Sequence, residues 1–252
     1  MKFFFYSSNS NEAIAAKEKF IKEYRQHSAE NADVIVPIGG DGFLLKSLHD
    51  FKQFKKPFYG INYGSIGFLM NTESDEKLDK IISSAQQIEL KPLKMKAKNN
   101  KGETFESIAF NEVSIMRQTH QASKISIKIN DIERMSELIC DGVLVSTAAG
   151  STAYNLSAHG SIIPLDSKLL ALTPISAFRP RRWKGALISE KMKINLYVNN
   201  STTRSSSVTA DHNQFRDIEE VEITSSKDSM CYLLFNNNHS MEERILKEQF
   251  TQ

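Results

Sequence analysis

The sequence predicts an α/β domain with a Rossmann-like parallel sheet, followed by a β-rich, β-sandwich-like domain and a C-terminal helix. In residues 1–90, short apolar strands alternate with amphipathic helices, which is typical of βαβ units. From Leu90 onward, apolar and polar residues alternate one by one, which is typical of half-buried strands. We therefore expect an α/β domain at 1–90, an all-β domain at 91–235, and a helix at 236–252 that could return to the first domain.

The elements of the first domain are predicted from two patterns. The strands are short runs of β-branched or aromatic residues, and the helices place apolar residues on one face among charged ones. On this basis we expect strands at 2–6, 34–38 and 56–62, and helices at 11–26, 43–51 and 76–87.

The second domain is predicted from seven runs with a two-residue period, separated by turn-forming segments such as NNKG. Residues 240–252 return to a helical pattern. The seven runs are LKPLKMKAK, TFESIAFNEVSIMR, SKISIKIN, ICDGVLVST, KMKINLYV, SSSVTAD and VEITSS.

Composition restricts the class of protein. The 32 Lys and Arg residues nearly balance the 30 Asp and Glu residues, so the net charge of +2 argues against a nucleic-acid-binding surface. The apolar runs are shorter than the ~18–20 residues that cross a bilayer, so we expect no membrane partner. Cys140 and Cys231 are the two cysteines, which argues against a disulfide framework and favours a cytoplasmic location.

The first candidate site is Gly39-Gly40-Asp41-Gly42, between the strand at 34–38 and the helix at 43–51. Glycines permit positive φ angles and leave backbone N–H groups open to phosphate oxygens, and a helix N-terminus favours an anion. A carboxylate among phosphates is explained if Asp41 binds a metal ion or takes a proton from an attacking hydroxyl. Alternatively, Asp41 caps the helix.

Two further candidates lie in the second domain. Asn111 and Glu112 interrupt an alternating strand with adjacent polar side chains, which suits contacts with ribose and adenine or a solvated strand end. The stretch from Cys140 to Ser161 carries an apolar strand into small residues, hydroxyls and one Tyr. That stretch suits a site for a sugar and a flat ring, or a Ser/Thr-rich surface loop. Asp141 adds a carboxylate where the strand begins.

In this order and at these separations, GGDG after a strand, then NE, then DG followed by AAGSTAYNLS resemble the NAD kinase family. The resemblance spans about Val34 to Asp211, and INYGSIGFL and LTPISAFRPRRW are similar to further loops of bacterial members. It implies transfer of the γ-phosphoryl group of ATP to the 2′-hydroxyl of the adenosine ribose of NAD, giving NADP. It also implies a divalent cation, Mg²⁺ or similar, and a homodimer or homotetramer.

The resemblance implies roles for individual residues. Asp41 would activate the hydroxyl, and Asn111 with Glu112 would hold the adenine and ribose of NAD. Asp141 would lie near the nicotinamide end, and Tyr154 would stack on a ring. The other residues expected to bind nucleotide are Gly39, Gly40, Gly42, Lys46, Phe68, Ala149, Thr152, Ala153, Asn155, Leu156, Ser157, Ala177 and Asn213.

The chain departs from the family pattern in three places. Phe43 stands where a Thr often follows GGDG, and Ala148 stands where the third motif usually has Pro. Asp211-His212-Asn213 replaces Asp-Gly-Gln, which leaves open whether Asn213 or Gln214 contacts a ligand.

Two other functions stay open at this point. Diacylglycerol and sphingoid-base kinases also carry a GGDG loop, although this sequence has no convincing membrane-binding element. A non-catalytic dinucleotide-binding sensor is the second alternative, but it would gain little from a carboxylate beside phosphates. The sequence does not decide between ATP and polyphosphate, between NAD and NADH, or whether NADP or NADPH regulates the protein.

Overall fold

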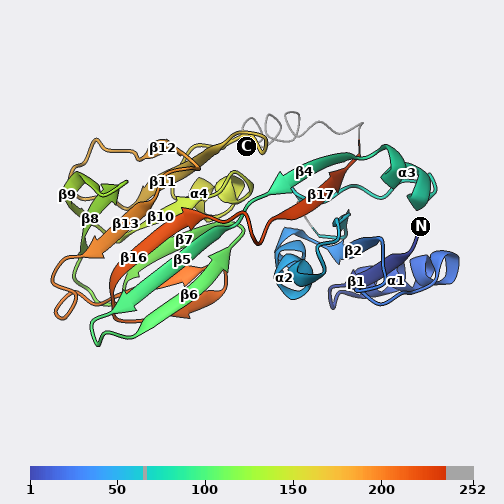
Figure 1. Ribbon diagram of the computed structural model, residues 1–252, viewed down its shortest axis with the longest axis horizontal. Helices are drawn as coiled ribbons and strands as arrows, with labels where there is room; N and C mark the ends of the chain where they lie inside the picture. The colour runs from blue at the N-terminus through green and yellow to red at the C-terminus, as the bar shows by residue number, and fades with distance from the viewer. Residues whose placement is uncertain (65–66, 237–252) are drawn as a thin grey trace. The chain divides into compact units, whose positions relative to one another are not determined.

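The computed structural model describes residues 1–64 and 67–236, and it divides into two compact units (Figure 1). Unit 1 comprises residues 1–90 together with the segment that begins at Ser229. Unit 2 comprises residues 91–228. The α/β fold class of the first unit and the β-rich fold class of the second are confirmed.

Unit 1 is built on a parallel sheet with the strand order β1-β2-β3. Its strands are β1 (Phe3–Ser7), β2 (Val34–Gly39) and β3 (Ile61–Asn62). Helices α1 (Asn11–Tyr24) and α2 (Asp41–Phe51) follow the first two strands. β2 is buried along its whole length, as expected for a parallel strand covered on both faces.

Helix α1 begins where the sequence predicts it, because Ser10 is its N-cap and accepts a hydrogen bond from the Ala13 amide at 3.3 Å. Its buried residues Ala13, Ala16 and Phe20 recur on one face and pack against β1. The predicted helix at 76–87 is only partly present. Helix α3 spans Leu78–Ser84, and Gln86–Leu90 form strand β4 because they pair with the last strand of the chain.

That last strand, β17 (Cys231–Phe235), belongs to unit 1, so its predicted place in the all-β domain is wrong. Phe58 bridges to Ile35 of β2 on one side and to Leu233 of β17 on the other. The buried side chain of Asn71 donates to the Leu234 carbonyl at 2.9 Å. The predicted helix at 240–252 lies outside the described residues.

Unit 2 contains two antiparallel six-stranded sheets. One sheet has the order β12-β11-β10-β7-β14-β15 and the other the order β6-β5-β16-β13-β8-β9. The strands are β5 (Leu93–Asn99), β6 (Thr104–Ala109), β7 (Glu112–Arg117), β8 (Ser123–Ile129), β9 (Ile132–Cys140), β10 (Gly142–Ser146), β11 (Leu169–Ile175), β12 (Ala186–Ser189), β13 (Ile194–Val198), β14 (Ser206–Ala210), β15 (Asn213–Phe215) and β16 (Ile218–Ser225).

The core of unit 2 lies between the two sheets, as in a β-sandwich. On β7, Val113 and Ile115 enter this core, so Glu112, Ser114 and Met116 face the other side of the sheet. A 3₁₀ turn η2 (Ala149–Thr152) and a short helix α4 (Tyr154–Ser157) follow β10. Among the described residues, no helix is long and apolar enough to cross a membrane.

Candidate functional site

The first candidate site lies at the carboxyl ends of β2 and β3 in unit 1. Because these strands are parallel, the loops that follow them leave the same edge of the sheet, where ligands commonly bind in α/β proteins. The loops touch directly, since the Tyr63 amide donates to the Gly39 carbonyl at 2.7 Å. A Cβ added to Gly64 would lie only 3.0 Å from the Cα of Gly40.

None of Gly39, Gly40 and Gly42 has a positive φ angle, and close packing explains the missing side chain at Gly39. Among the described residues, the glycines with positive φ are Gly102 and Gly185, so the conformational argument for GGDG is wrong. A Cβ on Gly39 would lie 3.0 Å from the Cβ of Phe43. Gly42 differs because it is exposed and has no atom within 4 Å of an added Cβ. The fold therefore gives no packing reason for Gly42, and its bare backbone is open to a ligand.

Asp41 does not cap α2. The N-cap is Gly40, which has no side chain, and Asp41 is the first helical residue. Its carboxylate instead accepts hydrogen bonds from the Phe68 amide at 2.7 Å and the Leu69 amide at 3.0 Å. These two bonds fix the direction of the carboxylate and hold the loop after β3 against the start of α2.

Two other residues predicted in unit 1 have defined surroundings. The backbone of Phe68 holds Asp41, and its side chain is half-buried. Lys46 is exposed, and its ammonium contacts Asp50 at 2.5 Å and donates to the hydroxyl of Tyr6 at 2.9 Å. Hydrogen bonds to Asp50 and then to Tyr6 raise the pKa of Lys46 above its ordinary value, so its charge is retained at neutral pH.

The second candidate site is the corner formed by Phe110, Asn111 and Glu112, where the chain passes from β6 in one sheet to β7 in the other. Asp211, in the two-residue turn between β14 and β15, holds this corner. Its carboxylate accepts the amides of Phe110 at 2.7 Å, Asn111 at 3.0 Å and Glu112 at 3.3 Å. Its own amide donates back to the Glu112 carbonyl at 3.2 Å.

The carboxyl group of Glu112 is unusual in its pKa and in its hydrogen bonding. Burial, followed by the nearby charge of Asp211, raises the pKa of the Glu112 carboxyl from 4.5 to about 7. Its Oε2 atom is buried and has no hydrogen-bond partner among the described residues. A buried polar atom of this kind is costly unless a ligand or water completes it. Together, these features favour Glu112 as a binding residue.

The third motif, the stretch from Cys140 to Ser161, packs closely against the corner at Phe110–Glu112. The Asn111 carbonyl accepts a bond from the Thr147 amide at 2.9 Å, and a Cβ on Gly150 would lie 2.3 Å from that carbonyl oxygen. The fully buried amide of Asn155 donates to the carbonyls of Ser151 and Ser161, at 3.1 and 3.0 Å. The side chain of Asn155 therefore shapes the loop from within.

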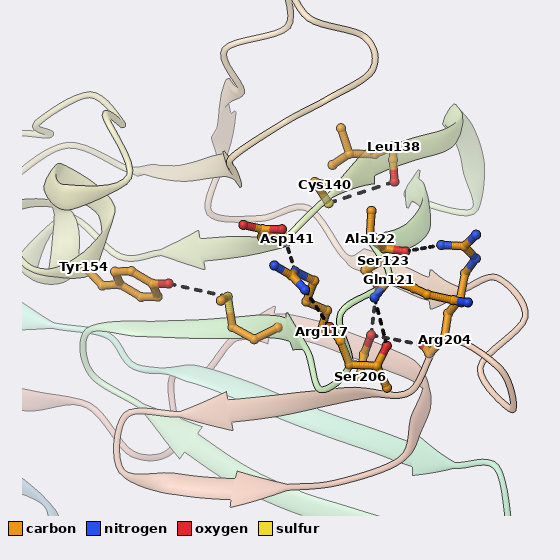
Figure 2. Close-up of polar contacts among 12 residues, drawn as sticks. Arg117, Gln121, Ala122, Ser123, Leu138, Cys140, Asp141, Tyr154, Arg204 and Ser206 are labelled. Carbon is orange, nitrogen blue, oxygen red and sulfur yellow. Dashed lines mark hydrogen bonds and ion pairs between the residues drawn. The ribbon is translucent and has the colours of Figure 1, made fainter.

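Asp141 and Tyr154 lie on the side of the sheet that carries this motif (Figure 2). Arg117 Nε donates to Asp141 at 2.6 Å, which forms a half-exposed ion pair. The hydroxyl of Tyr154 contacts the sulfur of Met116 at 3.4 Å. Burial, then Glu112, then Asp141 raise the pKa of Tyr154, so the two carboxylates act on the same hydroxyl. The structure thus brings Glu112, Asp141 and Tyr154 into one region.

The remaining predicted residues of unit 2 differ in exposure. Ala149 is buried, and Ser157 and Asn213 are exposed. The Asn213 side chain donates to Ser107 at 3.2 Å. The half-buried residues are Thr152, Ala153, Leu156 and Ala177, the last of which packs against the core.

Sequence reasoning missed Asp211 and Arg117, which hold two of the predicted site residues. Asp211 follows an alternating strand and is a residue type that tolerates the positive φ it adopts, 51°, so its place in a turn could be inferred from the sequence. Its partners at Phe110–Glu112 are about a hundred positions away, and no local signal reveals that pairing.

The described residues contain no group of three or more His, Cys, Asp or Glu side chains placed to hold a metal ion. In phosphoryl transfer, Mg²⁺ is bound largely by substrate phosphates and water with one or two carboxylates. In unit 1, Asp41 is the carboxylate at the glycine loops that would serve such an ion.

Comparison with known proteins shows the class to which the fold and these loops belong. Residues 3–89 match the model of the ATP-NAD kinase N-terminal domain, and residues 110–233 match that of the ATP-NAD kinase C-terminal domain. This chain belongs to the ATP-NAD kinase family, which confirms the resemblance seen in the sequence.

Individual relatives agree with this assignment. The chain is 50% identical to the NAD kinase of Rickettsia canadensis, over 94% of this chain and 93% of that protein. It is 48% identical to the NAD kinase of Xylella fastidiosa, over 98% and 95%. Among solved structures, yeast NADH kinase complexed with NADH has a TM-score of 0.80 at 17% identity, covering 100% of this chain and 88% of that one. An Archaeoglobus fulgidus NAD kinase in complex with ATP has a TM-score of 0.76 at 22% identity, covering 98% of both.

Proposed function

We propose that this protein is an NAD kinase that transfers the γ-phosphoryl group of ATP to the 2′-hydroxyl of the adenosine ribose of NAD. The bond between the γ-phosphorus and the β–γ bridging oxygen breaks, and a bond from the 2′-oxygen to that phosphorus forms. The products are NADP and ADP, and the hydroxyl proton is released. The observation that carries the proposal is similarity to an NAD kinase at 50% identity over 94% of this chain, joined to an oriented carboxylate at two glycine loops.

Asp41 is the residue we assign to the attacking hydroxyl. The amides of Phe68 and Leu69 hold its carboxylate in a fixed direction, and alignment of reacting groups lowers the barrier to transfer. A carboxylate with an ordinary pKa near ~3.9 is a weak base for a ribose hydroxyl. General-base help of ~10²–10⁴-fold therefore leaves much of the acceleration to positioning and to neutralisation of phosphate charge.

The phosphates of ATP are assigned to the loop at Gly39–Gly42 and the N-terminus of α2. Unsatisfied N–H groups of the first helical turn point toward an anion, and the helix dipole favours its charge. The lack of a side chain at Gly42 supports this assignment because nothing in the fold requires it. A divalent cation would enter with the triphosphate and neutralise part of its charge.

The dinucleotide is assigned to the region of unit 2 that contains Asn111, Glu112, Asp141 and Tyr154. Oε2 of Glu112, which has no hydrogen-bond partner among the described residues, would accept a hydrogen bond from a ribose hydroxyl. Tyr154 would offer an aromatic face on which a ring can stack. Thr152 and Ala153, which precede Tyr154, are small and half-buried. This region is polar, which supports a dinucleotide over the acyl chain of a lipid-kinase substrate.

Two further proposals concern the state of the protein. Cys140 and Cys231 are buried free thiols, which supports a reducing, cytoplasmic setting. Strand β12 is an edge strand, and its Leu187 and the neighbouring Leu169 are exposed on one face, which supports a homo-oligomer. A single species of monomer mass in sedimentation velocity would contradict the oligomer.

The test is a coupled assay for NADP with purified protein, ATP, NAD and a series of divalent cations. NADP formation that requires the cation supports the proposal. Phosphorylation of diacylglycerol in place of NAD would identify a lipid kinase, and NAD binding without NADP formation under any cation would identify a sensor.

A further inference from the structure

We propose that Asp211 is a positioning residue of the dinucleotide site, which holds the Asn111–Glu112 corner in the conformation that binds NAD. The inference rests on the proposed function, and it assigns a role to a residue that touches neither reacting atom. Its evidence is the geometry of one turn in unit 2.

Three hydrogen bonds converge on the carboxylate of Asp211. The amides of Phe110, Asn111 and Glu112 are consecutive, and all three point to Asp211, at 2.7, 3.0 and 3.3 Å. At this corner the chain leaves one sheet for the other, so these amides have no ladder partner of the usual kind. A negatively charged acceptor makes such bonds stronger than neutral ones.

These hydrogen bonds also affect the directions of the Asn111 and Glu112 side chains. Asn111 and Glu112 are adjacent, so the path of the backbone decides whether both can face the same ligand. Asp211 fixes that path at the point where Asn111 precedes β7 and Glu112 begins it. Without the three hydrogen bonds to Asp211, the corner would be displaced in a fraction of the molecules. The apparent dissociation constant for NAD would then rise in inverse proportion to the fraction of molecules that can still bind NAD.

Asp211 also acts on Glu112 through space, because its charge is the second cause, after burial, that raises the pKa of the Glu112 carboxyl to about 7. Among the described residues, Asp211 on the β14–β15 turn acts on Glu112, and Glu112 acts on Tyr154 of α4 together with Asp141, which pairs with Arg117. Removing this charge should lower the pKa of the Glu112 carboxyl, which gives the Asp211 substitution a readout beyond the loss of turn hydrogen bonds.

Asp217 offers a matched control. It lies in the same unit, just before β16, and has a positive φ of 58° like the 51° of Asp211. Its carboxylate accepts a bond from Ser205 at 2.6 Å, and its amide donates to Gln118 at 3.2 Å. It therefore shares the backbone conformation and structural use of Asp211, but not the contact with the Asn111–Glu112 corner.

The experiment compares wild type, Asp211→Asn, Asp211→Glu and Asp217→Asn in the full-length protein. Dissociation constants for NAD and ATP are measured by calorimetry from pH 5.5 to 8.5, and melting temperatures are recorded. We expect Asp211→Asn to weaken NAD binding by ~10–100-fold, because an amide cannot accept all three N–H groups, with ATP binding within about threefold of wild type. The pH at which NAD affinity changes should move downward, because one cause of the raised pKa of Glu112 is gone. Asp211→Glu should recover part of the affinity.

The outcomes are distinct. Equal losses of NAD affinity in Asp211→Asn and Asp217→Asn, with an unchanged pH profile, would overturn the inference and leave a structural turn. If Asp211→Asn does not fold, Asp211→Glu decides through its NAD affinity, because the longer side chain keeps the charge but displaces the acceptor oxygens; NAD affinity equal to that of wild type then counts against the inference. Failure of wild type to bind NAD would instead reject the proposed function.

Discussion

Asp41 in unit 1 and Asp211 in unit 2 use their carboxylates in the same way, but their surroundings differ. Each accepts consecutive backbone amides from another loop, Phe68 and Leu69 in one case and Phe110 to Glu112 in the other. Asp41 starts a helix beside open glycine backbone, whereas Asp211 faces a second, mostly buried carboxyl group. We therefore assign two roles to the same hydrogen-bond pattern. Asp41 is assigned to the reaction, and Asp211 is proposed to position the residues assigned to NAD binding.

This difference predicts separate consequences for the two units. Changes near Asp41 should alter turnover or the use of ATP, and changes near Asp211 should alter NAD binding and its pH dependence. Three substitutions sharpen or break this contrast.

The largest expected effect on stability comes from Glu112→Gln. Folded Glu112 keeps its proton up to about pH 7, whereas the unfolded carboxyl loses it near 4.5. The folded state therefore binds more protons between these values, and the free energy of unfolding falls as pH rises through that window. Between pH 4.5 and 7, the free energy of unfolding of wild type should fall by up to ~3 kcal/mol relative to that of Glu112→Gln, as measured by urea unfolding.

Glu106→Gln is the control for this titration. Glu106 is exposed on β6, and hydrogen bonds from Lys94 and Lys96 lower its pKa, so the sign of its pH dependence is opposite. If the difference in free energy of unfolding between wild type and Glu112→Gln did not change with pH, the electrostatic contrast between the two units would be contradicted.

Gly150→Ala should give the next largest effect. The added Cβ would lie 2.3 Å from the Asn111 carbonyl oxygen, so the third motif and the corner must separate. Such overpacking typically costs ~1–3 kcal/mol, and we expect that loss in the free energy of unfolding together with weaker NAD binding. Unchanged stability and unchanged NAD affinity would show that the two motifs are not interlocked as described.

Gly42→Ala should have the smallest effect on stability, with the opposite sign. The added Cβ meets no atom, and alanine favours a helix, so stability should rise by ~0.4–1 kcal/mol. The Michaelis constant for ATP should nevertheless increase several-fold, because the methyl group occupies the open backbone. Gly64→Ala is the contrast, since its Cβ would press on Gly40 and lower stability. An unchanged Michaelis constant for ATP would remove Gly42 from the phosphate site.

The sequence predicted local features well because their causes are local. The strand-loop-helix unit around Asp41 follows from apolar periodicity and glycine placement, and the family match then named the motifs. The helix predicted at 76–87 was too long because the pairing of Gln86–Leu90 with β17 depends on residues about 145 positions later. The hydrogen bonds from Phe110–Glu112 to Asp211 were missed for the same reason. The sequence indicates that Asp211 suits a turn, but it does not indicate which distant residues Asp211 contacts.

The most direct test of the central claim is the turnover number of Asp41→Asn beside wild type and the control Asp33→Asn. Asp33 is an exposed carboxylate of the same unit that accepts the Lys2 amide at 2.7 Å, away from the glycine loops. We expect Asp41→Asn to lower turnover by at least ~10²-fold with NAD binding nearly intact, and Asp33→Asn to behave as wild type. Near-normal NADP formation by Asp41→Asn would contradict the account.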